Sequence, residues 1–237
     1  MIFTPYVLFF YLFVFFALLQ IFYYLFFFSR LAFFKKHKAT NVENNFPVSI
    51  IVCAFNEEAN LKKNLPLLLH QHYFKDGKPN FEVVVVNDNS QDETFYLLNQ
   101  LQQQYAHLHV IHLTQEAKLI PGKKFPLSMG IKSARYEHVL LTDADCMPAS
   151  ESWLQSMSAC YTAQKQIVLG YSPFVKVAGW LNKKIRFDAA HAAIQYFSYA
   201  LAKLPYMGVG RNLSYQRQLF IDNKGFSSHH HLLSGDD

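Results

Sequence analysis

Residues 81–94 read FEVVVVNDNSQDET, an apolar stretch that gives way abruptly to carboxylate, amide and hydroxyl side chains. Four consecutive valines are typical of a strand that is buried on both faces, because β-branched side chains favour extended backbone and neither face is polar. We therefore predict a strand over Phe81–Asn87 and a helix over Gln91–Tyr105, where leucines recur at helical spacing. A strand of this kind belongs in a parallel sheet that helices cover.

The alternation of strands and helices continues on both sides of this stretch. Further strands are predicted at Val48–Ala54, Leu108–Leu113 and His138–Thr142, and helices at Glu57–Gln71 and Phe125–Ala134. Four β units with helices between them predict an α/β fold with a Rossmann-like, mostly parallel sheet. Later in the chain we expect helices over Trp153–Ala163 and Trp180–Lys203, a strand over Val168–Phe174 between them, and a turn-rich junction at Gly208–Asn212.

The chain begins with an apolar run, in which 17 of the residues from Val7 to Phe28 are Phe, Leu, Ile or Val. A helix over these residues is about 33 Å long, enough to cross a hydrocarbon core of about 30 Å. The run is too long for the core of a signal peptide, and no small-x-small cleavage site follows it. A buried core helix is the alternative, but such a helix usually keeps a polar face.

Basic residues follow the run directly, from Arg30 to Lys38, and such flanks favour the cytoplasmic side of a membrane. We expect a single-pass anchor over residues 1–38, a polar linker over 39–46 and a cytoplasmic domain over 47–237, in a bacterial-type inner membrane. The basic cluster largely explains the net charge of +5, so no nucleic-acid partner is implied. Three cysteines without metal-type spacing indicate a reduced, cytosolic domain.

Polar side chains follow three of the predicted strands, where a parallel sheet binds its ligands. They occur at Asn56-Glu57-Glu58, at Asn87-Asp88-Asn89-Ser90 and at Asp143-Ala144-Asp145. Helix capping could explain Ser90 and Asp92 alone, but it explains three such clusters at one edge less well. Alternate residues at a strand end bring Asp143 and Asp145 to one opening, and paired carboxylates suit Mg²⁺ or Mn²⁺ together with substrate phosphates.

Together these motifs resemble the family 2 glycosyltransferases of the GT-A fold, over roughly Pro47 to Asp237. The motifs are residues 48–57, VSIIVCAFNE; residues 86–94, VNDNSQDET; Gly122-Lys123-Lys124 before a helix; and residues 141–145, LTDAD. The resemblance implies transfer of a sugar from a nucleotide-sugar donor, most often a UDP-sugar, to a lipid, polysaccharide or other hydroxyl acceptor, with inversion and with a metal ion.

The resemblance also assigns roles to residues. Donor-binding residues would be Ala54, Asn56, Glu57, Asp88, Lys124, Asp143 and Asp145, the last two also holding metal. Gly210-Arg211-Asn212 would form an acceptor-side loop, for which a simple turn is the alternative. The catalytic base would be Asp236, with Asp237 as second choice. Because the family's pattern continues past this position, we expect the chain to be a truncated form.

Two alternatives remain open at this point. A strand followed by Asp-x-Asp also presents the nucleophile of haloacid-dehalogenase-type phosphatases, although that nucleophile usually follows the first strand and here three β units precede it. A non-catalytic nucleotide-sugar-binding fragment is the other. A dinucleotide oxidoreductase is disfavoured, because no Gly-x-Gly-x-x-Gly follows the first strand.

Overall fold

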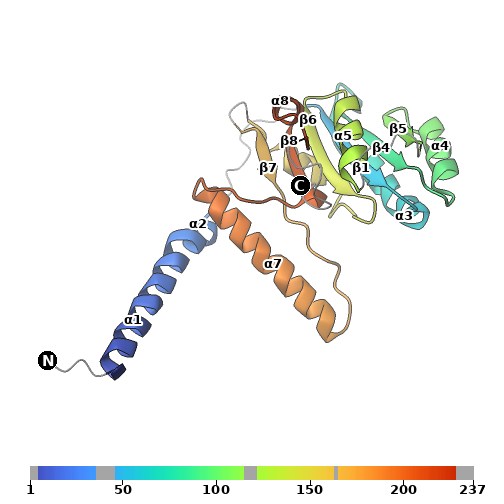
Figure 1. The fold of residues 1–237 in the computed structure, drawn as a ribbon. Helices are drawn as coiled ribbons and strands as arrows, with labels where there is room; N and C mark the ends of the chain where they lie inside the picture. The colour runs from blue at the N-terminus through green and yellow to red at the C-terminus, as the bar shows by residue number, and fades with distance from the viewer. Residues whose placement is uncertain (1–4, 36–45, 115–121, 163–164, 228–237) are drawn as a thin grey trace. The chain divides into compact units, whose positions relative to one another are not determined.

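The computed structural model describes residues 5–35, 46–114, 122–162 and 165–227 (Figure 1). The chain forms two compact units. One contains the N-terminal segment Met1–Lys38 together with Pro173–Met207, and the other contains Ala39–Ser172 together with Gly208–Asp237. Pro173–Met207, a segment of 35 residues inside the range predicted for the catalytic domain, therefore groups with the N-terminal helix.

The larger unit is built on a six-stranded sheet in the order β5-β4-β1-β6-β8-β7. Its strands are β1 (Val48–Ala54), β4 (Phe81–Asp88), β5 (Leu108–Leu113), β6 (His138–Asp143), β7 (Ile167–Leu169) and β8 (Leu213–Gln216). The four predicted β units pair in parallel, and β8 alone runs antiparallel to its neighbours β6 and β7. The prediction of a mostly parallel sheet flanked by helices is confirmed.

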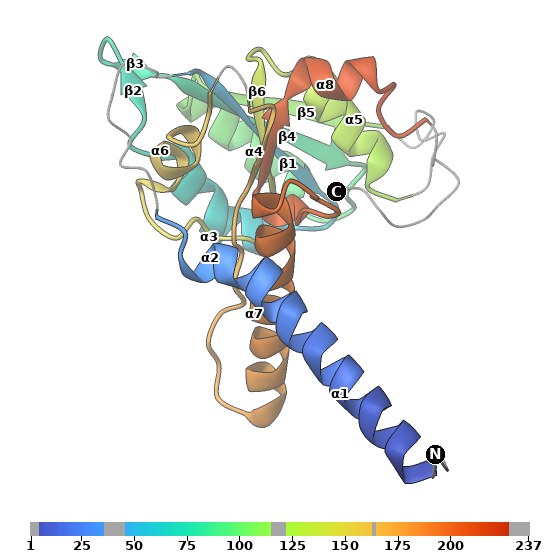
Figure 2. The same ribbon diagram turned by 90° about the vertical axis from the view of Figure 1, so that its left-hand side faces the viewer.

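Helices cover both faces of this sheet (Figure 2). They are α3 (Glu58–Leu69), α4 (Thr94–Gln104), α5 (Lys124–Ser133), α6 (Trp153–Ser158) and α8 (Arg217–Asp222). Val83 and Val85 pack in the core beneath α3, α4 and α6, whereas Val84 and Val86 pack on the opposite face beneath α5 and α8. Alternate valines thus serve two cores, which is why β4 carries no polar residue between Glu82 and Asn87.

Several elements differ from the sequence prediction. The helix expected to run to Ala163 ends at Ser158, because Tyr161 turns into the core, stacks on His138 and hydrogen-bonds Ser214. The strand expected over Val168–Phe174 stops at Leu169. Strand β8, helix α8 and a small hairpin of β2 (Phe74–Lys75) and β3 (Lys78–Pro79) had no periodic signal, since each is six residues or shorter.

The smaller unit pairs two long helices. The N-terminal helix runs without a break from Pro5 to Ala32 as α1 (Pro5–Tyr23), a π-helical turn η1 (Tyr24–Phe28) and α2 (Ser29–Ala32). It is long and apolar enough to cross a membrane, and no residue of its most apolar stretch is buried. The C-terminal end of helix α7 (Trp180–Leu201) lies beside the C-terminal end of this helix (Figures 1 and 2). There the rings of Phe27 and Tyr199 stack with centroids 4.2 Å apart.

Helix α5 lies unusually close to the sheet at Gly130. A Cβ at this position would stand 2.6 Å from Ile51 Cγ2 and 3.0 Å from Val86 Cγ2, both in the core. We therefore expect Gly130→Val to overpack the interface between α5 and the sheet and to destabilise the protein by about 1–3 kcal/mol or more. Thermal or urea unfolding would measure this loss. The exposed Lys132→Ala on the same helix should change stability little, and equal stability of both variants would contradict the close packing.

Candidate functional site

A cavity of about 470 Å³ opens at the carboxyl ends of β1, β4 and β6. Parallel strands all end at the same edge, so the segments that follow them converge there. The cavity is lined by Cys53, Ala54, Phe55, Glu57, Asp88, Gly122, Lys123, Pro126, Asp143, Ala144 and Asp145. Of the predicted donor-binding residues, Ala54, Glu57, Asp88, Asp143 and Asp145 therefore meet in one place.

The register of the sheet explains why these residues are neighbours. Ala54 of β1 pairs with Asn87 of β4, so Asp88 stands beside the residue that leaves β1. On the other side Cys53 pairs with Asp143, the last residue of β6. Asp88 and Asp143 thus flank the end of the same central strand. Asp88 is buried at 7 % exposure, whereas Asp145 is exposed.

The loops after β1 and β4 are tied together by hydrogen bonds. The Asn56 N–H donates to Ser90 Oγ at 2.9 Å, and the Gln91 N–H donates to Asn56 Oδ1 at 2.7 Å. Asn56 and Asn89 both adopt left-handed backbone, with φ of 55° and 56°, which asparagine tolerates better than most residues. Asn56 therefore shapes the rim by joining two loops, and it is not among the residues that line the cavity.

Asp92 also acts across these loops. Its carboxylate accepts the Glu58 N–H at 3.1 Å and the Thr94 N–H at 3.1 Å, and so serves the first turns of α3 and α4 together. Burial alone would raise the pKa of the Asp92 carboxyl, but the hydrogen bonds from Thr94 and Glu58 outweigh it and lower that pKa. The capping interpretation therefore describes what the Asp92 side chain does, whereas Ser90 binds the N–H of the loop residue Asn56.

A chain of side-chain hydrogen bonds links the end of β4 to β5 and to α4. Asn87 Nδ2 lies 3.1 Å from His112 Nδ1, and His112 Nε2 lies 3.2 Å from Asn99 Oδ1. An amide NH₂ only donates, so Nδ1 accepts and Nε2 carries the proton that goes to Asn99. Burial lowers the pKa of His112, which favours this neutral form. Asn87 Oδ1 remains available to accept the Ser90 N–H at 3.1 Å.

Two adjacent lysines at the start of α5 have different surroundings. Lys123 lines the cavity and forms an ion pair with Asp143 Oδ1. Lys124 is buried at 2 % exposure and does not line the cavity. The family resemblance assigns donor binding to Lys124, which stays a prediction, and the lysine of this pair that lines the cavity is Lys123.

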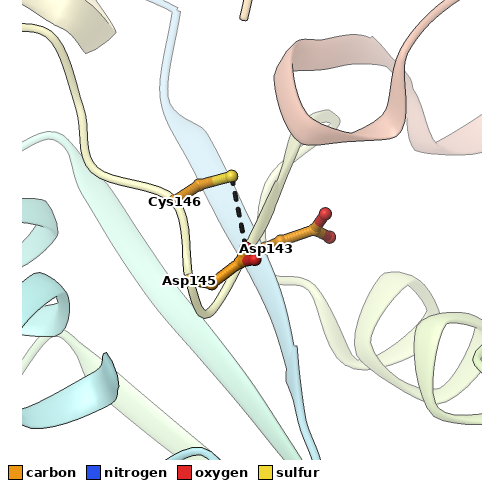
Figure 3. Close-up of side chains that lie close together, drawn as sticks. All are labelled: Asp143, Asp145 and Cys146. Carbon is orange, nitrogen blue, oxygen red and sulfur yellow. Dashed lines mark hydrogen bonds between the residues drawn. The ribbon is translucent and has the colours of Figure 1, made fainter. Parts of the chain in front are cut away.

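Asp143, Asp145 and Cys146 place one ligand atom each within 4.8 Å of one another (Figure 3). The Cys146 thiol donates to Asp145 Oδ1 at 3.5 Å. Burial, and after it the Asp145 and Asp143 carboxylates, raise the pKa of this thiol to about 11, so it stays protonated near neutral pH. A protonated thiol is a poor ligand for a hard cation, whereas the two carboxylates suit Mg²⁺ or Mn²⁺. The donor set therefore fits a hard divalent cation held by the aspartates.

The cavity is strongly acidic. Among the described residues, its lining contains four carboxylates, from Glu57, Asp88, Asp143 and Asp145, and one ammonium group, from Lys123, which gives these residues a formal charge of −3. An anionic ligand would be repelled by this charge at short range unless a cation accompanied it. The electrostatics therefore favour either a cationic ligand or an anionic one that arrives with a divalent metal.

The predicted acceptor-side residues form the 3₁₀ turn η3 (Gly210–Asn212). Asn212 is buried at 8 % exposure, accepts the Trp153 indole N–H at 3.2 Å and donates to the Tyr171 carbonyl at 3.0 Å. None of the three residues lines the cavity. Asp236 and Asp237, the predicted base and its alternative, lie outside the described residues.

Sequence reasoning did not single out Phe55 or Lys123, although both stand beside residues that it did name. Phe55 is 55 % exposed and lines the cavity directly after Ala54. Its signal was an aromatic ring between a buried strand and a polar helix start. For Lys123 the signal was the Gly-Lys-Lys motif. To choose between the two lysines one must know which residue begins α5 and so which way each side chain points; the helix begins at Lys124.

Comparison with known proteins gives a consistent result. Residues 49–228 match the family described as "Glycosyl transferase family 2". The chain is 30 % identical over 101 residues to the "Probable glycosyltransferase YdaM" of Bacillus subtilis (strain 168), covering 43 % of this chain and 23 % of that protein. It is 33 % identical over 120 residues to a beta-monoglucosyldiacylglycerol synthase of Nostoc, covering 50 % of this chain and 25 % of the synthase.

Among solved structures, a mannosyltransferase from Pyrobaculum calidifontis in complex with GDP-Man and Mn²⁺ aligns with a TM-score of 0.62 at 20 % identity. The alignment covers 86 % of this chain and 55 % of that one, and it shows a shared fold. The chain thus spans about a quarter of the length of the curated relatives described above. Nothing in these matches supports the phosphatase alternative.

The acidic group yields a prediction for metal binding. We expect Asp145→Asn to weaken Mn²⁺ binding, measured by titration in the presence of nucleotide, by about tenfold or more, because losing a ligand should cost at least as much as losing a supporting group. Asp76→Asn is a matched control, since Asp76 lies in the β2–β3 hairpin with φ 52°, a backbone that asparagine also tolerates. Equal Mn²⁺ affinity in both variants would remove Asp145 from the metal site.

Proposed function

The chain belongs to glycosyl transferase family 2, and we propose that it transfers a sugar from a nucleoside diphosphate donor to a hydroxyl acceptor, with inversion and with Mg²⁺ or Mn²⁺. The observation that carries this proposal is the joint presence of Asp88, Asp143, Asp145 and Lys123 around one cavity at the carboxyl edge of the sheet. A phosphate-bearing donor requires cations in a cavity whose described lining residues carry a formal charge of −3.

Each residue has a role that follows from its position. Asp88, at the end of β4, would accept hydrogen bonds from the base or the ribose, and Phe55, Ala54 and Glu57 would border the nucleoside. Asp143 and Asp145 would hold the divalent cation, which supplies charge neutralisation to the leaving diphosphate. Lys123, already paired with Asp143, would add a fixed positive charge on the α5 side, the role proposed from sequence for Lys124.

Inversion requires a carboxylate on the acceptor side. The acceptor oxygen forms its bond to the anomeric carbon as the bond to the diphosphate oxygen breaks, and the acceptor's proton passes to the base. We assign the base to Asp236, with Asp237 as the alternative, and the acceptor side to Gly210, Arg211 and Asn212. For the two aspartates this rests on the family resemblance of the chain.

The donor is proposed to be a UDP-sugar and the acceptor a lipid or glycan at the membrane. The apolar helix from Pro5 to Ala32, with Arg30 in its last turn and Lys35 just beyond its end, supports single-pass anchoring in the inner membrane with the catalytic unit in the cytoplasm. The Nostoc relative, by its name, makes a glycolipid, which agrees with an acceptor of this class.

A panel of nucleotide-sugars tests the donor. The measurement is the metal-dependent release of free nucleotide by the wild-type protein. We expect release from a UDP-sugar, its loss with a chelator, and a dissociation constant raised about tenfold or more in Asp88→Ala, since hydrogen bonds to a charged group contribute roughly 1.5–3 kcal/mol each. Glu151→Gln, on an exposed residue away from the cavity, is the control. Nucleotide binding without any release or transfer would favour the non-catalytic alternative, and unchanged affinity in Asp88→Ala would place the nucleoside elsewhere.

The base is tested by turnover and binding together. The Asp236→Asn variant should have a turnover that is lower by roughly a hundredfold or more, while its affinity for UDP stays nearly unchanged, because a base acts in the transition state. Asp237→Asn is the matched neighbour. Loss of turnover in that variant alone would move the assignment by one residue, and full turnover in both would exclude this pair.

A further inference from the structure

Exposed apolar side chains gather at the start of α7 and in the loop that leads into it. Trp180 is 80 % exposed, and Val175, Val177, Leu181 and Phe187 are 60–70 % exposed. With Phe174 they form what we call the docking surface, residues 174–187. Large apolar side chains in such a cluster are uncommon on a protein surface that faces only water.

Hydrogen bonds hold this surface together as one patch. Asn182 Oδ1 accepts the Val177 N–H at 2.9 Å, and Asn182 Nδ2 donates to the Val175 carbonyl at 3.1 Å. These bonds tie the backbone of the loop at Val175 and Val177 to the first turn of α7, the turn that also carries Trp180 and Leu181. The loop and the start of the helix are therefore joined by hydrogen bonds.

The charge of the same residues is strongly positive. The docking surface carries Lys176, Lys183, Lys184 and Arg186 and no acidic residue, and Asp188 is the first carboxylate to follow it. Lys176, Lys183 and Lys184 are exposed. Aromatic and aliphatic side chains mixed with ammonium groups suit the headgroup layer of a membrane, where rings sit at the level of the glycerol and cations meet phosphates.

The opposite end of α7 is fixed to the helix that can cross a membrane. Tyr199 stacks on Phe27 and lies 6.3 Å from the Tyr23 ring, close to the basic flank that begins at Arg30. Basic flanks of this kind mark the level at which a spanning helix leaves the apolar layer. A 22-residue helix reaches about 33 Å from that point.

We propose that the docking surface lies on the anionic face of the same membrane that holds the N-terminal helix, as a second membrane-binding element. Trp180, Leu181 and Phe187 enter the headgroup layer, while Lys183, Lys184 and Arg186 contact lipid phosphates. The four basic residues within residues 174–187 make the segment too polar to span the bilayer. The inference goes beyond sugar transfer and rests only on the membrane anchor proposed above.

Trp180 is a built-in reporter, because the chain contains two tryptophans and the other, Trp153, belongs to the sheet unit. The full chain is reconstituted into vesicles of phosphatidylcholine, with or without phosphatidylglycerol, and tryptophan quenching by brominated lipid is measured after flotation. We expect stronger quenching with the anionic lipid, and loss of most of it in Trp180→Phe. Lys183→Glu/Lys184→Glu should weaken docking by about fivefold or more per reversed residue.

Lys75→Glu/Lys78→Glu, a pair of exposed lysines opposite each other in the β2–β3 hairpin, is the matched control and should leave the quenching unchanged. A chain that floats with equal quenching in wild type and Trp180→Phe would overturn the docking alone. Shielding of Trp180 from acrylamide without quenching by brominated lipid would assign the surface to a protein partner and overturn it too. A chain that does not float would overturn both the anchor and the docking, whereas nucleotide release reports separately on the glycosyltransferase activity.

Discussion

The parallel pairing of β1 with β4 on one side and with β6 on the other is the constraint on which the larger unit depends. This pairing sets Asn87 opposite Ala54 and Asp143 opposite Cys53. A shift of one residue would send every valine of β4 to the opposite core and would also separate Asp88 from Asp143. The same strand register therefore fixes both the packing of the core and the positions of Asp88 and Asp143 at the cavity.

The acidic character of the cavity adds a second constraint, since carboxylates held this close together repel one another. Lys123 offsets part of that repulsion by pairing with Asp143, and the start of α5 must lie close to the sheet for this pair to form. Gly130, by admitting Ile51 and Val86 to the helix backbone, allows that approach. Gly130 thus contributes indirectly to the ion pair between Lys123 and Asp143 at the start of α5.

The strands of the central sheet could be predicted closely from the sequence, because burial on both faces leaves a continuous apolar signal. Val48–Ala54 and Leu108–Leu113 match their strands at both ends. Helix starts were less predictable: α4 begins at Thr94 and not at Gln91, since Ser90 and Asp92 turn their polar atoms to the loop after β1. Such bonds join residues 34 positions apart, and no local pattern encodes them.

The same limit applies to the candidate site. The carboxylates at the strand ends were predictable, because their position follows from the sheet. Lys123 was not distinguished from Lys124, and the grouping of residues 173–207 with the N-terminal helix had no sequence signal, since it depends on contacts such as that of Phe27 with Tyr199.

Asn212 connects the turn η3 with the segment that follows β7. The segment 173–207 leaves the sheet unit after β7 and returns to it just before η3, and Asn212 bonds to the chain on the outgoing side. Its carbonyl accepts the Gly170 N–H at 2.8 Å, and its side-chain amide donates to the Tyr171 carbonyl. A Cβ on residue 170 would stand 2.3 Å from the Asn212 side chain, so this closure requires the glycine. The oxygen of the Asn212 side-chain amide accepts from Trp153 and its nitrogen donates to Tyr171, so these bonds hold the turn that contains Gly210 and Arg211. The point at which the chain departs towards its proposed membrane contact is therefore the point at which the proposed acceptor loop is fixed.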